Sequence, residues 1–353
     1  MHVVHIVGAR PNFMKAAPVH RALTGLKSIR QSLIHTGQHY DAGMSDIFFQ
    51  QLEMPPADVN LGVGSGSQAQ QTAEVMIRLE PFLAEQRPQL VLVYGDVNST
   101  LAAALVCAKL NVKLGHVEAG LRSGDRTMPE EINRIVTDRL AQLLFTPSPD
   151  GDENLLREGV DAKNIHRVGN VMIDTLMRLL PHCPDSQSQA PWILVTLHRP
   201  SNVDDLEWLG ALLNVLSDLS QSIPVIFPVH PRTRQRIADL GPKKFSDRLQ
   251  LVDPRSYLEF LALQKGASLV ITDSGGVQEE TTFLGVPCLT VRENTERPIT
   301  IELGTNQLVG RDLDLLRTEA KRILSGEKKK SSAIPLWDGH AADRIANTIS
   351  ELI

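Results

Sequence analysis

The chain has 353 residues, 42% of them hydrophobic and 22% charged, which suits a globular protein of about two domains. Its 36 Lys and Arg against 41 Asp and Glu give a formal net charge of −5, without the basic surface that nucleic-acid binding requires. No apolar run approaches the roughly 18 residues of a membrane span, and no basic segment of a signal peptide opens the chain. Three scattered cysteines offer neither a disulfide framework nor a metal site, so we expect a cytoplasmic protein without metal.

Short apolar runs alternate with helical periodicity from the first residue onward. In the first half, strands are expected at residues 2–7, 90–94 and 112–117, and helices at 11–26 and 99–110. This alternation is typical of βαβ units that build a parallel sheet.

A connector rich in proline and small polar residues, at 181–191, interrupts this pattern. The alternation then restarts, with further strands expected at 192–197, 224–229, 249–252, 268–272 and 286–291. The sequence therefore predicts an α/β protein with two doubly wound domains, 1–180 and 191–338, that face a cleft. A last helix at about 339–353 is expected to pack back on the first domain. Ligands of open α/β sheets bind at the carboxyl ends of the strands, so the functional residues are sought there.

Two cations follow the first expected strand. Arg10 and Lys15 lie at or just inside a helix amino terminus, where positive charge opposes the helix dipole unless an anion binds. We therefore expect an anionic ligand there, the alternative being two ordinary surface cations. The chain contains neither GxGxxG after this strand nor GxxxxGK[ST] anywhere, which argues against a nicotinamide dinucleotide and a P-loop nucleotide.

Three acidic residues follow later strands of the first half. Asp96 could equally cap a helix or take part in chemistry. Glu118 comes directly after an apolar strand and is poorly explained by capping, which favours a functional role. Glu130 fits a capping box with Thr127, and its spacing from Arg134 is that of an ordinary helix-surface pair. Only the three acids together indicate a cluster at one edge of the sheet.

Two histidines end strands of the second half. His198 and His230 could serve as general acids or bases near neutral pH, or could be structural. They lie on separate strands without local ligand spacing, so a metal role is disfavoured.

The most specific local motif is Ser274-Gly275-Gly276, where an apolar strand runs into a helix. Bare backbone N–H groups at a helix start favour a diphosphate, which glycine allows to approach closely. Glu280 follows about one turn later, within reach of a ribose diol. The pattern predicts a nucleoside diphosphate site, the alternative being a tight turn without ligand. Two arginines after the next strand could complete it: Arg292 and Arg297.

A series of segments resembles, in the same order, the family of non-hydrolysing UDP-N-acetylglucosamine 2-epimerases. The segments are GARPNFMKAAP, TGQHYD, VYGDVNST, HVEAGLRS, MPEEINR, VTLHR, PVHPRTR, TDSGGVQEE and TERP, between Gly8 and Pro298. The resemblance implies two Rossmann-like domains of the glycosyltransferase-B type, a homodimer, and no cofactor. The implied activity is reversible conversion of UDP-GlcNAc to UDP-ManNAc for surface polysaccharides.

The resemblance also implies roles for individual positions. The catalytic positions are Asp96, Glu118, Glu130 and His198. The substrate contacts are Arg10, Lys15, Gln38, Arg134, His230, Phe260, Ser274, Gly275, Gly276, Glu280, Arg292 and Arg297, with Phe260 beside the uracil. Which carboxylate is the base, and whether a second UDP-GlcNAc binds near Gln38, stay open.

Chemistry narrows the route of such a reaction. No carbonyl acidifies the hydrogen on carbon 2, so either a dinucleotide oxidises carbon 3 transiently or UDP is eliminated from carbon 1 to give a glycal. The missing dinucleotide motif favours elimination, with a carboxylate as base and the anion site holding UDP. The alternatives are a C2 epimerase of UDP-2,3-diacetamido-2,3-dideoxyglucuronic acid, a hydrolysing epimerase, a glycosyltransferase-B enzyme and a non-catalytic UDP-sugar-binding regulator.

Overall fold

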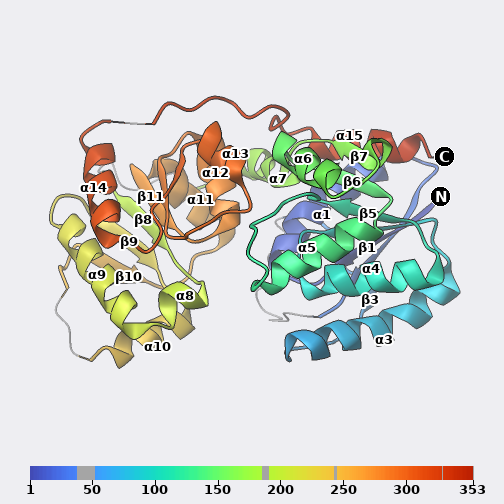
Figure 1. The fold of residues 1–353 in the computed structure, drawn as a ribbon, viewed down its shortest axis with the longest axis horizontal. Helices are drawn as coiled ribbons and strands as arrows, with labels where there is room; N and C mark the ends of the chain where they lie inside the picture. The colour runs from blue at the N-terminus through green and yellow to red at the C-terminus, as the bar shows by residue number, and fades with distance from the viewer. Residues whose placement is uncertain (38–51, 185–190, 242–244, 328, 353) are drawn as a thin grey trace. The chain divides into compact units, whose positions relative to one another are not determined.

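The computed structural model describes residues 1–37, 52–184, 191–241, 245–327 and 329–352. The chain divides into two compact units (Figure 1): Met1–Thr175 with Pro335–Ile353 form the first, and Leu176–Ile334 the second. The division falls inside helix α7 (Val171–Leu179), before the connector expected at 181–191. Within the described ranges, no helix is both long and apolar enough to cross a membrane.

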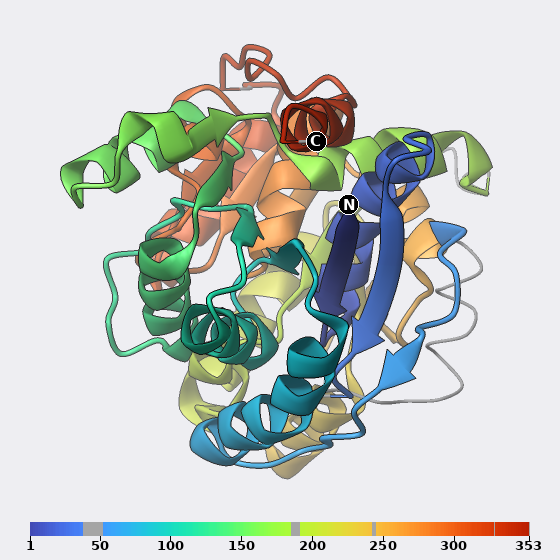
Figure 2. The same cartoon turned by 90° about the vertical axis from the view of Figure 1, so that its right-hand side faces the viewer.

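The first unit is a parallel sheet with helices on both faces (Figure 2). Its strands are β1 (His2–Val7), β2 (Arg30–His35), β3 (Val59–Asn60), β4 (Leu90–Tyr94), β5 (Leu114–Val117), β6 (Leu143–Thr146) and β7 (Ile165–Arg167). They pair in the order β3-β2-β1-β4-β5-β6-β7. Its other helices are α1 (Arg10–Thr24), α3 (Gln68–Gln86), α4 (Asn98–Leu110), α5 (Pro129–Leu140), α6 (Pro149–Arg157), α15 (Ala341–Ser350) and the short 3-10 helix η1 (Ala162–Asn164). Helix α15 packs against α1, so the end of the chain lies on the first unit.

The second unit repeats this architecture with a six-stranded sheet in the order β10-β9-β8-β11-β12-β13. Its strands are β8 (Ile193–Thr196), β9 (Val225–Pro228), β10 (Leu249–Val252), β11 (Leu269–Thr272), β12 (Cys288–Thr290) and β13 (Asn306–Leu308). Its helices are η2 (Leu180–His182), α8 (Pro200–Val203), α9 (Leu206–Ser220), α10 (Pro231–Asp239), α11 (Tyr257–Gly266), α12 (Gly275–Leu284), α13 (Pro298–Glu302) and α14 (Leu313–Leu324). The predicted α/β class with two parallel sheets is confirmed.

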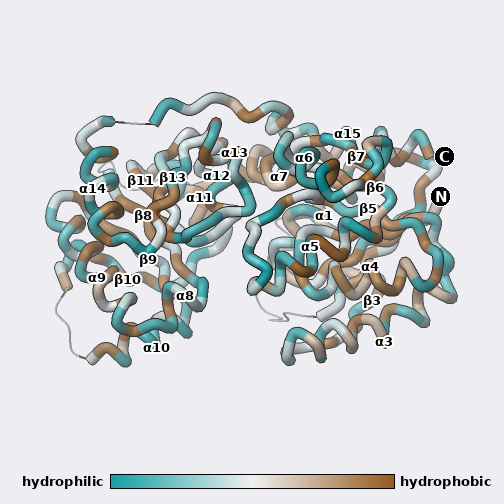
Figure 3. The backbone as a smooth tube through the Cα atoms, in the orientation of Figure 1, coloured by the Kyte–Doolittle hydropathy of each residue, from teal (hydrophilic) through white to brown (hydrophobic). Residues whose placement is uncertain are grey.

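The central strands are rich in apolar residues because helices cover both faces of each sheet. All residues of β1 and β4 are buried, and the expected bounds 2–7, 90–94 and 249–252 are confirmed residue for residue. Figure 3 shows hydrophobic residues along the strands, and hydrophobic alternating with hydrophilic residues along the helices. The core of the second unit is a large cluster between its sheet and α9 and α14.

Each sheet has a topological switch point, where the chain stops adding strands toward one edge and begins to add them toward the other. In the first unit β1 and β4 are neighbours whose following helices depart toward opposite edges, and in the second β8 and β11 have this relation. Such switch points leave room beyond the carboxyl ends of the strands, where open sheets bind ligands. Asp96, His198 and Ser274, three of the residues expected to be functional, lie two residues after β4, β8 and β11.

Candidate active site

Glu118 and Lys15 form a buried ion pair in the first unit. Glu118 follows β5 and is 5% exposed, and Lys15 reaches it from α1 with 2.5 Å between Nζ and Oε2. The φ of Glu118 is 75°, a left-handed conformation that costs a non-glycine residue about 1 kcal/mol or more. Its amide donates to the Phe145 carbonyl oxygen (3.0 Å), which holds this backbone in place. Lys15, expected to meet an anionic ligand, has a carboxylate of the protein itself as its counter-charge.

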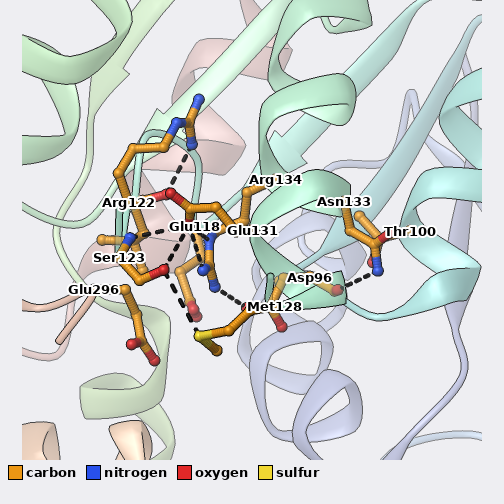
Figure 4. Close-up of polar contacts among 12 residues, drawn as sticks. Asp96, Thr100, Glu118, Arg122, Ser123, Met128, Glu131, Asn133, Arg134 and Glu296 are labelled. Carbon is orange, nitrogen blue, oxygen red and sulfur yellow. Dashed lines mark hydrogen bonds and ion pairs between the residues drawn. The ribbon is translucent and has the colours of Figure 1, made fainter. Parts of the chain in front are cut away.

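Arg134 links two acids on the same side of this sheet (Figure 4). Its Nη1 lies 2.5 Å from Oδ2 of Asp96, and its Nε and Nη2 donate to Oε2 of Glu131 at 3.1 and 2.6 Å. Glu131 also accepts the backbone N–H groups of Ser123 and Gly124, both at 2.9 Å. Burial by itself raises the pKa of the Glu131 carboxyl. The hydrogen bonds from the Ser123 amide and the Arg134 guanidinium outweigh this effect, so the pKa lies below its ordinary value. Asp96 is therefore held by a fully buried arginine that Glu131 fixes in turn.

The expected capping box at the start of α5 is wrong. The helix begins at Pro129 with Met128 as its N-cap, and Thr127 donates its N–H and Oγ1 hydrogens to Asp125 instead. The expected pairing of Glu130 with Arg134 is also wrong, because Arg134 binds the acids described above. Glu130 is half-buried, and within the described part of the chain its carboxylate has no ion pair or hydrogen bond. Neither structural explanation for Glu130 therefore holds.

In the second unit, His198 is oriented by a buried aspartate that the sequence did not single out. Asp273 follows β11 and accepts the backbone N–H groups of His198 and Arg199 and the side-chain amide of Asn202. Nδ1 of His198 lies 2.9 Å from its Oδ1. Burial raises the pKa of the Asp273 carboxyl, but the His198 and Asn202 hydrogen bonds bring it below its ordinary value. An ionised Asp273 keeps the proton on Nδ1 and leaves Nε2 of the largely exposed imidazole available.

The glycine-rich helix start has the geometry of an anion site. Helix α12 begins at Gly275, and the side chain of its N-cap, Ser274, makes no capping hydrogen bond. A Cβ on Gly275 would collide with the guanidinium of Arg297, whereas a Cβ on Gly276 would meet nothing within 4 Å. Gly275 therefore lets an arginine approach the helix start, and Gly276 leaves space in front of it, as phosphate binding at a helix end requires.

The two arginines beside this helix are paired with acids. Nη2 of Arg292 lies 2.7 Å from Glu296, and Arg297 contacts Glu296 at 2.6 Å and Glu279 at 2.7 Å. Nη1 of Arg292 is buried and has no hydrogen-bond partner among the described residues. The arginine charges are thus balanced by carboxylates that the sequence did not single out, and one guanidinium nitrogen remains for a ligand.

Glu280 is buried on α12 and already holds two neighbours. Its Oε1 accepts from the hydroxyl of Tyr257 (2.8 Å) and its Oε2 from the side-chain amide of Gln264 (2.6 Å). Phe260, on α11, is partly buried against the apolar cluster around Trp192. A ribose contact by Glu280 and a uracil contact by Phe260 stay predictions.

Three further residues were expected to contact the substrate: Arg10, Gln38 and His230. Arg10 is the first residue of α1, and Gln38 lies outside the described residues. His230 is exposed and caps α10, where its Nδ1 accepts the Arg232 N–H at 3.3 Å. In the described ranges, no group of three or more His, Cys, Asp or Glu side chains is arranged to hold a metal ion.

Comparison with known proteins adds to this geometry. The family model described as UDP-N-acetylglucosamine 2-epimerase matches residues 21–350. A UDP-N-acetylglucosamine 2-epimerase of Methanococcus maripaludis is 40% identical over 98% of this chain and 97% of the relative. A UDP-2,3-diacetamido-2,3-dideoxy-D-glucuronate 2-epimerase of Pseudomonas aeruginosa is also 40% identical, over 100% of both chains.

Solved structures give the same result. The crystal structure of Methanocaldococcus jannaschii UDP-GlcNAc 2-epimerase in complex with UDP-GlcNAc and UDP has 40% sequence identity and a TM-score of 0.91, covering 99% of this chain and 100% of that one. The resemblance drawn from the sequence motifs is confirmed, and so is the glycosyltransferase-B type of fold. The chain belongs to the UDP-N-acetylglucosamine 2-epimerase family.

Proposed function

We propose that the protein interconverts UDP-GlcNAc and UDP-ManNAc by inverting carbon 2 of the sugar, without releasing the free sugar. The observation that carries this proposal is Glu118. It is a buried carboxylate in a left-handed backbone, at a strand end beside the switch point of its sheet. Strain of this kind is concentrated at functional sites, and a protein that only bound the nucleotide would not need it.

The first unit supplies acid and base groups for an elimination. One carboxylate of Asp96, Glu118 and Glu130 takes the proton from carbon 2. The bond between carbon 1 and the phosphate oxygen breaks with its electron pair on UDP, and a double bond forms between carbons 1 and 2. A proton then returns to carbon 2 from the opposite face while UDP adds back to carbon 1, so the net reaction is an isomerisation.

The second unit supplies the nucleotide contacts. The N–H groups at the start of α12 and the free nitrogen of Arg292 bind the diphosphate and stabilise the charge that it gains on leaving. Glu280 binds the ribose, with Phe260 beside the uracil. His198, with Nδ1 held by Asp273, orients or protonates the diphosphate through Nε2.

We further propose that the protein acts as a homodimer in the cytoplasm and supplies ManNAc units for surface polysaccharides. The family membership supports the dimer and the pathway. The three cysteines are all unpaired thiols, which fits a reducing compartment.

A second candidate substrate is UDP-2,3-diacetamido-2,3-dideoxyglucuronic acid. The relative that is named for this substrate matches the whole chain at the same 40% identity as a relative named for UDP-GlcNAc. Both substrates carry an acetamido group and a hydrogen on carbon 2, so the same carboxylates would serve either one.

Proton NMR of the purified protein in D₂O with UDP-GlcNAc tests the proposal. We expect UDP-ManNAc with deuterium at carbon 2, and Glu118→Gln should abolish its formation while leaving UDP binding within about twofold. The control is Glu153→Gln, an exposed acid on α6, which should change neither quantity.

Other outcomes identify the alternatives. Unchanged UDP-GlcNAc with conversion of the diacetamido-uronate would establish the second candidate. Free ManNAc would indicate a hydrolysing enzyme, and consumption only with an added sugar acceptor would indicate a glycosyltransferase. Binding of both nucleotide sugars without conversion would refute catalysis.

A further inference from the structure

His116 lies in β5 and has no exposed surface. Both nitrogens of its imidazole are hydrogen-bonded. Nε2 lies 2.8 Å from the carbonyl oxygen of Gly95, which follows β4, and Nδ1 lies 2.6 Å from Oδ1 of Asp138 on α5. A neutral imidazole has one donor and one acceptor, so the nature of these partners decides its protonation.

Both partners act as acceptors. The Gly95 carbonyl cannot donate, so Nε2 carries a hydrogen. Oδ2 of Asp138 receives the Gly120 N–H at 3.1 Å and the Arg122 guanidinium at 2.8 Å, which favours an ionised carboxylate. Burial raises the pKa of the Asp138 carboxyl, but the neighbouring His116 and Arg122 lower it to below its ordinary value. The hydrogen between Nδ1 and Oδ1 therefore belongs to the imidazole.

Asp138 and Arg122 belong to a series of contacts that runs from His116 to the surface. Arg122 also binds Glu158, with Nε and Nη2 each 2.8 Å from a carboxylate oxygen. Glu158 is exposed, so its charge is screened by water, and the acceptor character of Gly95 and Asp138 decides the protonation of His116. Of the adjacent charges, Lys15 pairs with Glu118, and Arg134 binds both Asp96 and Glu131, which leaves one carboxylate charge in excess.

We propose that His116 is a positioning residue with a hydrogen on both ring nitrogens, which fixes the separation of the loops that carry Asp96 and Glu118. Its Nε2 holds the carbonyl directly before Asp96, and its own backbone lies two residues before Glu118. Through Asp138 it is tied to the Gly120 amide and to the helix that carries Arg134. The inference deepens the proposed function, because the carboxylates that it positions are the acid and base groups of the epimerisation.

The first unit contains an internal control. His5, on β1, is equally buried, but its partners are the hydroxyl of Tyr94 at 2.6 Å and the side-chain oxygen of Gln31 at 2.9 Å. A hydroxyl can donate to Nδ1, so this imidazole is satisfied in its neutral form. Burial accordingly lowers the pKa of His5 to about 3. The two buried histidines should therefore differ in protonation at neutral pH.

Nitrogen-15 NMR of histidine-labelled protein at pH 7 tests the protonation, with His116→Asn and His5→Asn assigning the signals. We expect His116 to show two protonated nitrogens and His5 to show one. In Asp138→Asn the new carboxamide can donate to Nδ1, so His116 should become neutral with its hydrogen on Nε2. A single protonated nitrogen on His116 in the unsubstituted protein would overturn the proposal.

Kinetics test the positioning role. His116→Asn should lower kcat at least about tenfold with KM within about twofold, because the carboxylates shift while the nucleotide contacts lie in the other unit. Asp138→Asn keeps the bond to Gly95 and should lose about threefold. His5→Asn is the matched control for loss of a buried histidine and should stay within about twofold. Equal losses of kcat in His116→Asn and His5→Asn would refute a specific positioning role for His116. If the unsubstituted protein does not epimerise its substrate, the proposed function is refuted, but the NMR result on His116 still stands.

Discussion

The buried pair of Lys15 and Glu118 makes a quantitative prediction about stability as well as activity. At 2.5 Å between Nζ and Oε2, with both side chains under a tenth exposed, the gross attraction is about 7 kcal/mol at an effective dielectric constant of about 20. Desolvation offsets much of this, but removing one partner strands the other charge, which costs about 3–5 kcal/mol. We therefore expect Glu118→Gln and Lys15→Met each to destabilise the first unit by about that amount. The double variant should be destabilised by at least about 2 kcal/mol less than the sum of the two single variants.

The assay must report on the first unit by itself, because a chain with two compact units need not unfold in one step. Trp337 belongs to the first unit, where its Nε1 donates to the Pro147 carbonyl oxygen at 2.9 Å. In a background in which Trp192 and Trp208 of the second unit are replaced by Phe, the fluorescence of Trp337 during urea unfolding follows the first unit.

The matched control is an exposed ion pair of the same unit. Arg78 and Glu74 on α3 are 3.0 Å apart, but both side chains are more than two fifths exposed. Their double-mutant cycle should give a coupling below about 0.5 kcal/mol. A coupling for Lys15 and Glu118 as small as that of this control would refute the reasoning, because a buried ion pair cannot be broken at so little cost.

Three further predictions follow from other features. Gly275→Ala should weaken both folding and substrate binding, because the added methyl collides with Arg297, whereas Gly276→Ala has room and should raise KM without lowering the urea midpoint. Asp273→Asn should lower kcat at least about tenfold, since the imidazole loses the carboxylate that fixes its tautomer; unchanged kcat would remove this role. Because the pKa of His5 is lowered to about 3, the unfolded chain binds a proton at this residue below pH 6.5, whereas the folded chain binds it only below about pH 3. The free energy of unfolding therefore falls as the pH drops from 6.5 to 3. The free energy of unfolding of the unsubstituted protein, measured with urea, should fall relative to that of His5→Asn by about 2.5 kcal/mol between pH 7 and pH 4.5.

The sequence by itself determined the fold class and the places where function should be sought. Strands buried on both faces must be continuous apolar runs, so β1 and β4 could be bounded to the residue. Glu118 is recognisable because capping does not explain a glutamate directly after an apolar strand, and Ser274 because the two glycines that follow it suit a phosphate at a helix start. These are local properties of the chain, which hydrophobic periodicity and turn chemistry express directly.

Helix starts were less predictable, because local hydrogen bonds compete. Thr127 has the spacing of an N-cap to Glu130, but the nearby carboxylate of Asp125 takes its hydrogen bonds, and Met128 caps α5 instead. In a capping box the Thr127 N–H would bind the Glu130 side chain, whereas here it binds Asp125, and the course of the loop before the helix selects between the two acceptors.

Only the tertiary structure decided which charges pair. Helical spacing allows Arg134 to meet Glu130 or Glu131, and its approach to Asp96 from another element selects the second. Asp273 comes from a strand that follows His198 by more than seventy residues, and parallel pairing of β8 with β11 makes them neighbours. Partners of buried charges are chosen by the three-dimensional order of the strands, since burial without a counter-charge costs more than any local preference can supply.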